Sequence, residues 1–536
     1  MYSTVISASI CGIESRKVIV EADVSDGLPT FGLVGFLASE TREAAERVRT
    51  ALRNSGVRLS AQHVTVNLAP ASFHKEGALC DLAIAIALMG GYGFFPRQAL
   101  EGVLLLGELN LNGVIGPVRG VLEIVAHARE YGCDTVIVPE ANLAEGSVVE
   151  DVAVLGASNL NQVIHFFGQR SKGVVYPLEE SAYEPPLIPP DPLSSMKIDI
   201  NALRKEQSGS QGIDFSQIRG QTLMRRAAEI AVSGFHNLLM IGPPGAGKSM
   251  TAKRIATILP ETSLEEALEI TKIHSIAGTL PKGTGLMTTR PFRAPHHTVT
   301  APALCGGGSP PGPGEISLAH RGVLYLDEMP EFNRPALEML RGPLEDGKIR
   351  ISRVSGTYTF PADFMLIASM NPCPCGYFPD RTRCTCTNAQ VKKYLTRISM
   401  PLLDRIDMCV EAHRVKYDEL TTEPPQDSSL VIRGRVTAAR AIQEERYRGS
   451  GFRFNADLNA EAVQRYCTLD ADGEKMMRRV YEKMHLTARS YNRVLKTART
   501  IADLSGEAVI SAVHLAEAIS YRAVDRKYWE DALHIT

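Results

Sequence analysis

The chain has 536 residues, of which 44% are hydrophobic and 22% are charged, a composition typical of a globular protein with about three domains. Its formal net charge of −2 excludes a global basic field, so any nucleic-acid contact must come from local basic clusters. Residues 1–20 lack a basic segment before the apolar run, and no apolar stretch reaches the length of about 18 residues that a membrane span needs. We therefore expect a cytoplasmic protein whose ten cysteines are free thiols or metal ligands.

The first predicted domain covers residues 1–168, where short apolar runs alternate with helical patterns. We predict strands at Val18–Val24, Val64–Leu68, Gly102–Leu109 and Thr135–Val138, and helices at Ser39–Gly56, Ala78–Met89 and Val121–Tyr131. This alternation indicates an α+β or α/β fold. The acidic, proline-rich stretch 177–192 is typical of a linker, and we assign residues 169–213 to it.

The second and third predicted domains cover residues 214–414 and 415–536. Strands and helices alternate in the second domain, which holds most of the candidate chemistry, so its expected class is again α/β. Beyond residues 423–425 the chain becomes helical to its end. Helices are expected near Val431–Arg446, Ala460–Cys467, Glu474–Met484, Ala488–Leu504 and Ser511–Tyr521, which together fit a helical bundle.

A phosphate-binding loop follows the apolar run Leu238–Ile241. Its residues are Gly242, Pro243, Pro244, Gly245, Ala246, Gly247, Lys248 and Ser249, and Met250 continues into a helical pattern. This sequence of strand, loop and helix matches the P-loop, in which glycines let backbone N–H groups surround phosphates and the helix dipole attracts them. Lys248 is expected to reach the β- and γ-phosphates of ATP, Ser249 to ligate Mg²⁺, and the whole segment to bind the nucleotide.

Two more apolar runs end in polar residues that suit ATP hydrolysis. Val323–Leu326 precedes Asp327 and Glu328, which places two carboxylates at the end of a buried strand, where open α/β sheets bind ligands. Asp327 is expected to hold the Mg²⁺ shell and Glu328 to polarise the attacking water. Phe364–Ser369 precedes Asn371, whose side chain can orient that water from the end of a neighbouring strand. The alternative is that Asn371 is an ordinary turn residue.

In these segments the chain resembles the AAA+ superfamily, and specifically its magnesium-chelatase-like ComM or YifB branch. The resemblance spans nearly the whole sequence. It is carried by IGPPGAGKS and by the stretches Arg290–Thr298, Pro313–Glu328, Ala368–Gly376, Arg397–Asp407 and Ala498–Leu504. It implies a ring, a hexamer of identical chains, with ATP bound between subunits.

The same resemblance implies roles for single residues. Asn371 falls at the sensor-1 position. Arg405 falls at the arginine finger, a planar and permanently charged group that stabilises the transferring phosphoryl group in the neighbour's site. Arg489 matches the sensor-2 arginine of a helical lid, with Arg493 as a second candidate, although without the resemblance either is a surface helix residue. Ile218 belongs to a segment like the one that packs against adenine.

A β-hairpin is predicted where Lys348–Arg353 alternates basic and apolar residues ahead of a turn and a second strand. In related helicases such a hairpin lines the pore, so Lys348, Arg350 and Arg353 are candidate contacts for DNA phosphates. A solvated hairpin without a ligand is the alternative. The Gly/Pro-rich stretch 301–314 is expected to be a mobile loop and not a packed element.

The N-terminal domain resembles the Lon-protease fold without its catalytic pair. Leu79 stands at the serine position of the segment Lys75–Asp81, and Leu122 at the lysine position of Gly116–Leu122. Since a Ser–Lys pair needs a hydroxyl and an amine in contact, the domain is expected to be catalytically inert. Cys80, one position along, is expected to be a buried structural thiol, which leaves assembly or substrate docking as the domain's role.

Two Cys-x-Cys pairs form a candidate zinc site. Cys373, Cys375, Cys384 and Cys386 offer four thiolates for tetrahedral coordination. The single-residue spacer departs from the usual pairs, so four free thiols in a loop are the alternative. The adjacent histidines His296 and His297 are expected to point to opposite faces of a strand and not to share a metal.

The function that these inferences favour is an ATP-driven hexameric DNA translocase or helicase. As the resemblance implies, it would promote branch migration in homologous recombination, notably when DNA is integrated in natural transformation. Single-stranded or branched DNA and recombination proteins are the expected partners. The alternative is a protein-remodelling motor of the magnesium-chelatase type, although the chelatase motor subunit begins at its AAA+ module. An ATP-dependent protease is disfavoured by the missing Ser–Lys pair.

Overall fold

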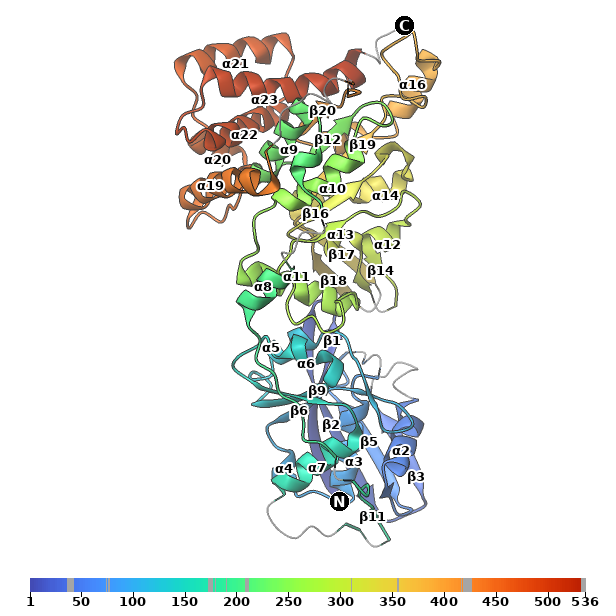
Figure 1. Ribbon diagram of the computed structural model, residues 1–536. Coiled ribbons are helices and arrows are strands. Elements are labelled where there is room, and N and C mark those ends of the chain that lie inside the picture. The colour runs from blue at the N-terminus through green and yellow to red at the C-terminus, as the bar shows by residue number, and fades with distance from the viewer. Residues whose placement is uncertain are drawn as a thin grey trace.

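The computed structural model describes residues 1–35, 43–73, 75, 78–171, 177–178, 180–188, 190–207, 212–309, 311–353, 356–415, 417 and 427–531. The molecule is elongated, with an N-terminal sheet at one end and a second α/β unit beyond it (Figure 1). The C-terminal helices pack beside the far part of that second unit. No helix in the described ranges is both long enough and apolar enough to cross a membrane.

The N-terminal unit is built on a seven-stranded mixed sheet with the order β10-β9-β6-β1-β2-β5-β3. Its central hairpin pairs β1 (Tyr2–Cys11) with β2 (Glu14–Ser25), and Gly12 takes the φ of +68° that the tight turn needs. α3 (Asp81–Gly91) packs on both strands and is buried nearly all round because its residues are almost all apolar. The unit also contains β3 (Thr30–Val34), β5 (His63–Ala69), β6 (Val103–Leu105), β8 (Ile115–Gly116), β9 (Thr135–Pro139), β10 (Ala153–Ala157), α2 (Ala44–Asn54), α4 (Arg97–Leu100), α5 (Val121–Ala126), α6 (Leu143–Gly146) and α7 (Leu160–Arg170).

Several boundaries in this unit differ from the prediction. The predicted strand 102–109 is broken into β6 and β7 (Glu108–Leu109), and at the break a Cβ added to Gly107 would lie 2.6 Å from the Ile115 side chain. α3 begins later and α5 ends earlier than predicted, and β1, β3, β10 and α7 are absent from the prediction. Residues 39–42 of the predicted first helix lie outside the described residues.

The stretch assigned to a linker is partly folded onto the N-terminal unit. β11 (Ala182–Tyr183) pairs with β4 (Val57–Arg58), and α8 (Ile200–Gln207) follows it toward the second unit. Strand pairing satisfies backbone polar groups without needing an apolar side-chain pattern, so a composition rich in proline does not reveal this attachment. Parts of the stretch, such as 172–176 and 208–211, lie outside the described residues.

The second unit holds a parallel five-stranded sheet with the order β13-β16-β19-β12-β20. Its strands are β12 (Leu238–Ile241), β13 (Phe292–Arg293), β16 (Val323–Leu326), β19 (Met365–Met370) and β20 (Met408–Glu411). Alternate residues of β12 belong to two different hydrophobic clusters. Both faces of the sheet are therefore covered, which explains why β12, β16 and β19 are apolar nearly throughout.

Helices and two short hairpins surround this sheet. The helices are α9 (Thr222–Gly234), α10 (Lys248–Ile258), α11 (Leu264–Ala277), α12 (Ala301–Cys305), α13 (Glu315–Leu318), α14 (Arg334–Met339), α15 (Pro343–Asp346), α16 (Asn388–Leu395) and α17 (Met400–Leu403). The hairpins are β14 (Gly306–Gly307) with β15 (Gly312–Pro313), and β17 (Lys348–Arg353) with β18 (Gly356–Pro361). α11 docks on α5 of the N-terminal unit, where Lys272 Nζ lies 2.7 Å from Glu123 Oε2.

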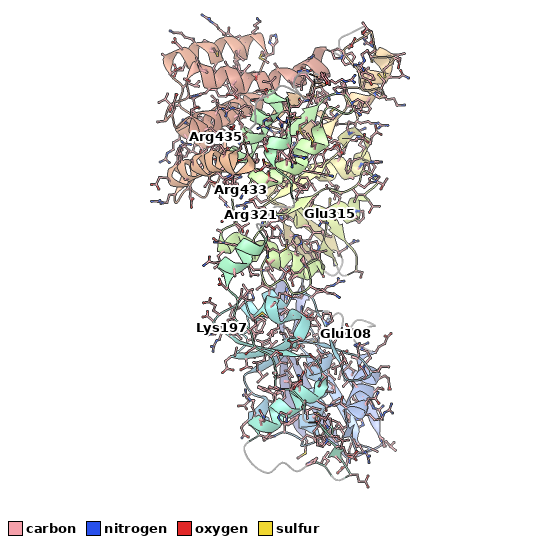
Figure 2. All side chains as sticks on the ribbon, viewed as in Figure 1. Glu108, Lys197, Glu315, Arg321, Arg433 and Arg435 are labelled. Carbon is pink, nitrogen blue, oxygen red and sulfur yellow. The ribbon has the colours of Figure 1, made fainter. Side chains whose placement is uncertain are left out.

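The C-terminal part is a helical bundle, as predicted. It comprises α19 (Ser429–Tyr447), α20 (Ala460–Tyr466), α21 (Ala471–Lys483), α22 (Ala488–Leu504), α23 (Ala512–Asp525) and a π-helical turn (Arg526–Asp531). Figure 2 labels Arg433 and Arg435 on α19. Arg433 Nε donates to Thr257 O of α10 at 3.1 Å, and Arg435 Nε donates to Glu229 Oε1 of α9 at 2.5 Å. These contacts attach the bundle to α10, which follows the P-loop, and to α9, which precedes β12.

Candidate active site

The loop between β12 and α10 has the backbone geometry of an anion cradle. Gly245 and Gly247 take φ values of +76° and +83°, which residues with a side chain rarely adopt. A Cβ on Gly242 would lie 2.3 Å from the Ala412 carbonyl oxygen, so this position also requires glycine. The loop leads into the N-terminus of α10, whose N–H groups and dipole favour a bound phosphate.

Lys248, the first residue of α10, is only 8% exposed. Its Nζ donates to the carbonyl oxygens of Gly242 at 2.6 Å and Pro243 at 2.9 Å, and to Asn371 Oδ1 at 3.2 Å. Burial lowers the pKa of Lys248 to about 8, against the attraction of the two carboxylates that follow β16. A phosphate in the loop would supply the counter-charge that stabilises this buried ammonium.

Ser249 and Asp327 offer two oxygen ligands in contact with each other. Ser249 Oγ donates to Asp327 Oδ2 at 2.8 Å, and the buried Ser369 Oγ on β19 donates to Asp327 Oδ1 at 2.5 Å. Burial acts to raise the pKa of Asp327, but these hydrogen bonds outweigh it and hold the pKa below its ordinary value. A hydroxyl and an ionised carboxylate are ligands that Mg²⁺ takes beside nucleotide phosphates. The donor set therefore fits Mg²⁺. Sequence reasoning missed Ser369, whose only signal is a hydroxyl at the end of an apolar strand.

Glu328 and Asn371 lie at the carboxyl ends of β16 and β19. Glu328 has a φ of +51°, which is uncommon for a residue with a side chain, and its N–H donates to Asp327 Oδ1 at 3.1 Å. Asn371 follows the strand next to β12 and so meets Lys248 from one strand over. The structure thus gathers Lys248, Ser249, Asp327, Glu328 and Asn371 at one edge of the sheet, and we call these five residues the phosphate half-site.

Ile218 and Met250 lie near the loop in different environments. The Ile218 side chain is fully buried in the core, and Arg225 Nη1 donates to its carbonyl oxygen at 3.0 Å. Gln221, with a φ of +56°, donates to Ala246 O of the loop at 2.9 Å. Met250 is 37% exposed on α10. The segment before α9 is therefore tied to the P-loop through Gln221, while the Ile218 side chain itself contributes to core packing.

Arg405 and Arg489 meet around a single carboxylate, that of Glu345 on α15. Arg405 Nη2 pairs with Glu345 Oε2, and Arg489 Nη2 lies 3.3 Å from Glu345 Oε1. Arg405 also donates to the carbonyl oxygens of Pro401 at 2.6 Å and Arg341 at 3.2 Å. The hydrogen bond from Arg405 holds the pKa of Glu345 below its ordinary value, so this carboxylate is an anion at neutral pH.

Arg493 lies one turn further along α22 and is nearly buried. Its Nη1 donates to Ile406 O at 3.3 Å, and its Nη2 lies 3.3 Å from Asp404 Oδ1. It lines a cleft of about 1420 Å³ together with Arg405, Arg489, Glu345 and Lys348. We call Arg405, Arg489 and Arg493 the arginine half-site.

The two half-sites are separate surfaces of one chain. None of residues 242–249 lines the cleft that holds the arginines. Within the described part of the chain, the polar partners of Arg405, Arg489 and Arg493 all lie outside the P-loop. The structure therefore brings the acidic and lysine candidates together with the loop, and gathers the three candidate arginines elsewhere.

The basic hairpin β17–β18 forms as an antiparallel pair, and its turn residues 354–355 lie outside the described residues. Lys348, Arg350 and Arg353 are all exposed on it. Tyr358 on β18 packs against the β1–β2 turn, where a Cβ on Gly12 would lie 3.2 Å from the tyrosine ring. The hairpin thus lies where the second unit meets the N-terminal unit (Figure 1).

The glycine-rich stretch 301–314 is packed, which corrects the expectation of a loose loop. It forms α12 and the β14–β15 hairpin. A Cβ on Gly306 would lie 3.1 Å from Ile351 Cδ1 of β17, and one on Gly314 would lie 2.3 Å from the Gly306 nitrogen. Here the glycines permit close approach of backbones, which composition cannot distinguish from mobility. Residue 310 lies outside the described residues.

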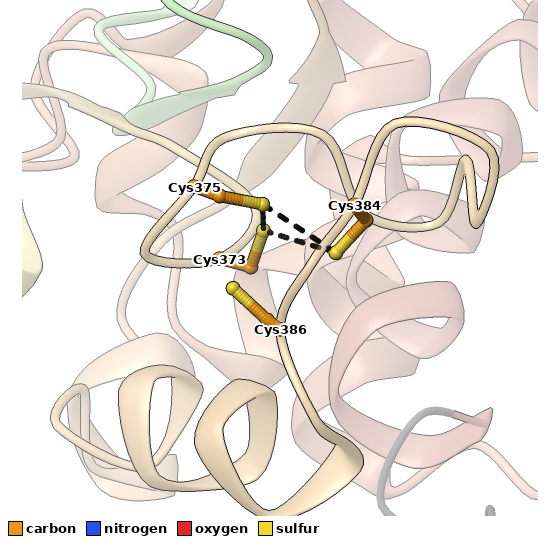
Figure 3. A group of neighbouring side chains, drawn as sticks. All are labelled: Cys373, Cys375, Cys384 and Cys386. Atoms are coloured by element: carbon orange, nitrogen blue, oxygen red, sulfur yellow. Dashed lines mark hydrogen bonds between the residues drawn. The ribbon is translucent and has the colours of Figure 1, made fainter.

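The four cysteines of the two Cys-x-Cys pairs converge in one loop (Figure 3). The Sγ–Sγ distances are 3.4 Å for Cys373–Cys375, 3.7 Å for Cys373–Cys384 and 3.5 Å for Cys375–Cys384. Cys386 belongs to the same group, and all four sulfurs lie within 4.8 Å of one another. Sulfurs bound at about 2.3 Å to a tetrahedral zinc lie about 3.8 Å apart. The donor set therefore fits zinc, and we call these four residues the cysteine cluster.

The adjacent histidines do not point to opposite faces, so that expectation is wrong. His296 and His297 lie at a turn, and their ring centroids are 4.0 Å apart. A strand would have separated the rings, whereas the turn brings them together. Among the described residues, neither histidine belongs to a group of three or more metal-ligating side chains.

In the Lon-like segments of the N-terminal unit, leucines occupy the serine and lysine positions, Leu79 and Leu122. Leu122 is 3% exposed, and its N–H donates to Glu145 Oε1 at 2.8 Å. Burial raises the pKa of the Cys80 thiol to about 11, so the thiol stays protonated at neutral pH. Leu79 is partly buried against the core, and residues 76–77 beside it lie outside the described residues.

Comparisons with known proteins cover the chain nearly from end to end. A model described as magnesium chelatase, subunit ChlI, matches residues 214–420, one described as subunit ChlI of Mg-chelatase matches 20–142, and the ChlI C-terminal model matches 426–522. Competence protein ComM of Haemophilus influenzae is 38% identical over 97% of each chain. The uncharacterized protein YifB of Escherichia coli is 38% identical over 98% of this chain and 97% of its own. Lon protease 1 of Herpetosiphon aurantiacus is 30% identical over 27% of this chain and 19% of its own.

Proposed function

The chain belongs to the magnesium-chelatase-like AAA+ family that includes ComM and YifB, and we propose that it is a cytosolic, ATP-driven hexameric DNA translocase. The observation that carries the proposal is the separation of the phosphate half-site from the arginine half-site. An arginine must contact the transferring phosphoryl group to stabilise it, so a complete site takes one half from each of two copies. Repeated contacts between two unlike surfaces close into a ring when the rotation between neighbours divides a full turn, which for a hexamer is one sixth.

In this ring, each phosphate half-site binds ATP and the neighbour supplies the arginines. Lys248 holds the β- and γ-phosphates, and Ser249 and Asp327 hold Mg²⁺, which when bound neutralises phosphate charge. Glu328 accepts a proton from the attacking water while Asn371 orients that water. The neighbour's Arg405 and Arg489 stabilise the charge that develops on the γ-phosphoryl group.

The exposed basic hairpin supports DNA as the polymer that the ring moves. Lys348, Arg350 and Arg353 present three cations on one exposed hairpin, and the β14–β15 hairpin lies beside it. Cations on a hairpin can contact successive phosphates of a strand. The name of the ComM relative, a competence protein, favours a role in natural transformation. There the motor would drive branch migration of incoming single-stranded DNA during homologous recombination.

The test is DNA binding and DNA-stimulated ATP hydrolysis by the purified protein. Changing Lys348, Arg350 and Arg353 together to Gln should weaken binding to forked DNA. The slope of the logarithm of the binding constant against the logarithm of salt concentration should fall in magnitude by about three. A matched triple change on α21, at the exposed Lys475, Arg478 and Arg479, should leave both unchanged. If DNA neither binds to the protein nor stimulates its ATP hydrolysis, while a partner protein does both, the motor is a protein-remodelling machine of the magnesium-chelatase type.

We further propose that the cysteine cluster binds a structural Zn²⁺ and that the N-terminal unit is an inert docking or assembly module. The sulfur spacing supports the zinc site.

Leu79 and Leu122, in place of a nucleophile and a base, support an inert N-terminal unit. A denatured protein should therefore stay intact when it is incubated with the chain and ATP. Its degradation would overturn the proposal that the N-terminal unit is inert.

A further inference from the structure

The cysteine cluster lies in a loop that contacts both the nucleotide loop and the C-terminal turn. Resting on the proposed zinc site, we propose that the bound metal acts as a clamp. It holds the cluster loop against the P-loop and against the π-helical turn, so that metal occupancy sets nucleotide affinity.

The first contact of the clamp is with the P-loop. Gly376, between the two cysteine pairs, has a φ of +85°, and a Cβ there would lie 2.5 Å from Pro244 Cδ. The same loop begins at Asn371, whose Oδ1 accepts from Lys248 Nζ at 3.2 Å. A shift of the cluster loop would therefore move both the wall of the P-loop and the partner of Lys248.

The cluster loop is held by hydrogen bonds within itself, such as that from Cys384 N–H to Asp380 O at 2.8 Å, and by burial of Cys373 and Phe378 in the core. The Phe378 N–H donates to Cys373 Sγ at 3.3 Å, and Arg381 donates to Cys386 O at 2.9 Å while its guanidinium stacks 4.9 Å from the Phe378 ring. Thiols at van der Waals distance attract one another only weakly, whereas four zinc–thiolate bonds fix both cysteine pairs at once. A bound metal would therefore add a direct constraint between the two cysteine pairs.

The second contact of the clamp is with the C-terminal turn. Phe378 meets the Tyr528 ring edge-on with centroids 6.2 Å apart, and Tyr528 Oη donates to Glu411 Oε1 at 2.7 Å. Glu411 lies beside Ile241 in the sheet, at the start of the P-loop. Trp529 is 2% exposed, and its Nε1 donates to Leu395 O at 3.2 Å. The turn therefore links the cluster loop to the same strand end that carries the P-loop.

Trp529 is the single tryptophan of the chain, so its fluorescence reports on the clamp without any added label. Full-length protein purified without chelator should contain near-stoichiometric zinc. Removing it with a zinc chelator should shift the Trp529 emission to longer wavelength and weaken binding of a fluorescent ATP analogue by about tenfold or more. Adding zinc back should reverse both changes.

Variants separate loss of metal from loss of contact. Cys384→Ser combined with Cys386→Ser should reproduce the chelated state, while Cys305→Ser, a buried cysteine of the same unit, should not. Gly376→Ala should retain zinc and leave the Trp529 emission unchanged. It should weaken binding of the ATP analogue, because the added Cβ meets Pro244. Gly449→Ala is the matched control, since Gly449 has a similar φ of +75° but open space around it.

The outcomes distinguish the clamp from the zinc site on which it rests. Wild-type protein without zinc would overturn both. Zinc that can be removed with no change in Trp529 emission or analogue affinity would overturn the clamp alone. A Gly376→Ala variant that binds the analogue as wild type does would also overturn it. None of these readouts involves DNA, so they do not depend on the proposed translocase activity.

Discussion

The phosphate half-site lies within the second unit, whereas the arginine half-site joins that unit to α22 of the helical bundle, and the two differ in how their side chains are held. Lys248 is 8% exposed and is fixed by three oxygen acceptors at buried strand ends. Arg489 and Glu345 have side chains that are 50% and 53% exposed, and they meet in an ion pair. An exposed pair contributes about 1 kcal/mol or less, so Arg489 can exchange Glu345 for a stronger anion, while the less exposed Arg405 is also held by two backbone carbonyls. One half is thus preorganised within the chain, and the other can accept a neighbour's phosphate.

The largest effect is expected from Arg405→Ala, which should leave analogue binding by the isolated chain nearly unchanged but lower turnover about 1000-fold, as expected for an arginine supplied by a neighbour. Steady-state ATPase assays over a range of protein concentrations test this. Arg334→Ala, at an exposed position on α14, should retain wild-type turnover. Full activity of Arg405→Ala at every concentration would remove the basis for a shared site.

The next largest effect is expected from Lys248→Ala, which removes the ammonium charge from the phosphate half-site. Nucleotide affinity should fall about 100-fold, because charge-assisted hydrogen bonds to the phosphates are lost. Titration with a fluorescent ATP analogue measures this loss. Lys253→Ala, at an exposed position on the same helix, is the control, and equal weakening by both variants would contradict the assignment.

The lowered pKa of Lys248, about 8, predicts a pH dependence of nucleotide affinity. In the empty site the ammonium loses its proton as pH rises through this value, and phosphate binding needs the charged form. Affinity should therefore fall about tenfold between pH 7 and pH 9. A Lys248→Arg variant that still binds the analogue should show a flat profile, since guanidinium stays charged. A flat wild-type profile would show that Lys248 does not titrate in this range.

The smallest effect is expected from Glu345→Gln, which removes the exchangeable partner of Arg405 and Arg489. Turnover at subsaturating ATP should rise about threefold, because the arginines no longer leave an ion pair to reach the neighbour's phosphate. Glu338→Gln, which breaks a nearby pair with Arg341 at 3.0 Å, should have no such effect. A decrease in turnover for Glu345→Gln alone would mean that this carboxylate positions the arginines productively.

The sequence predicts the phosphate half-site well because it is encoded locally. Glycines at fixed spacing, a following lysine and apolar runs that end in carboxylates specify strands and loops within a few residues of the functional groups. The role of Asn371 is harder to predict from the sequence, since only the pairing of β19 with β12 brings this residue to Lys248. Ser369 is not predicted because its partner, Asp327, follows a different strand, β16, which only the pairing of β16 with β19 brings beside it.

The arginine half-site and the contacts of the cysteine cluster depend on tertiary structure. Glu345, Arg405 and Arg489 lie on three separate segments, and nothing local indicates that one carboxylate joins two arginines. The packing of Gly376 on Pro244 is hidden for the same reason. The expectations for the histidine pair and the stretch 301–314 are wrong because a turn and a glycine-mediated contact replace the strand and the loop that composition favours.

The most direct test mixes two inactive variants, Glu328→Gln and Arg405→Ala. The first binds ATP without hydrolysing it and keeps its arginines; the second keeps a complete phosphate half-site. If neighbours complete one another's sites, a one-to-one mixture should recover about one quarter of wild-type ATPase activity, the share of random contacts that join two intact halves. A mixture no more active than the mean of its two components would contradict the shared site.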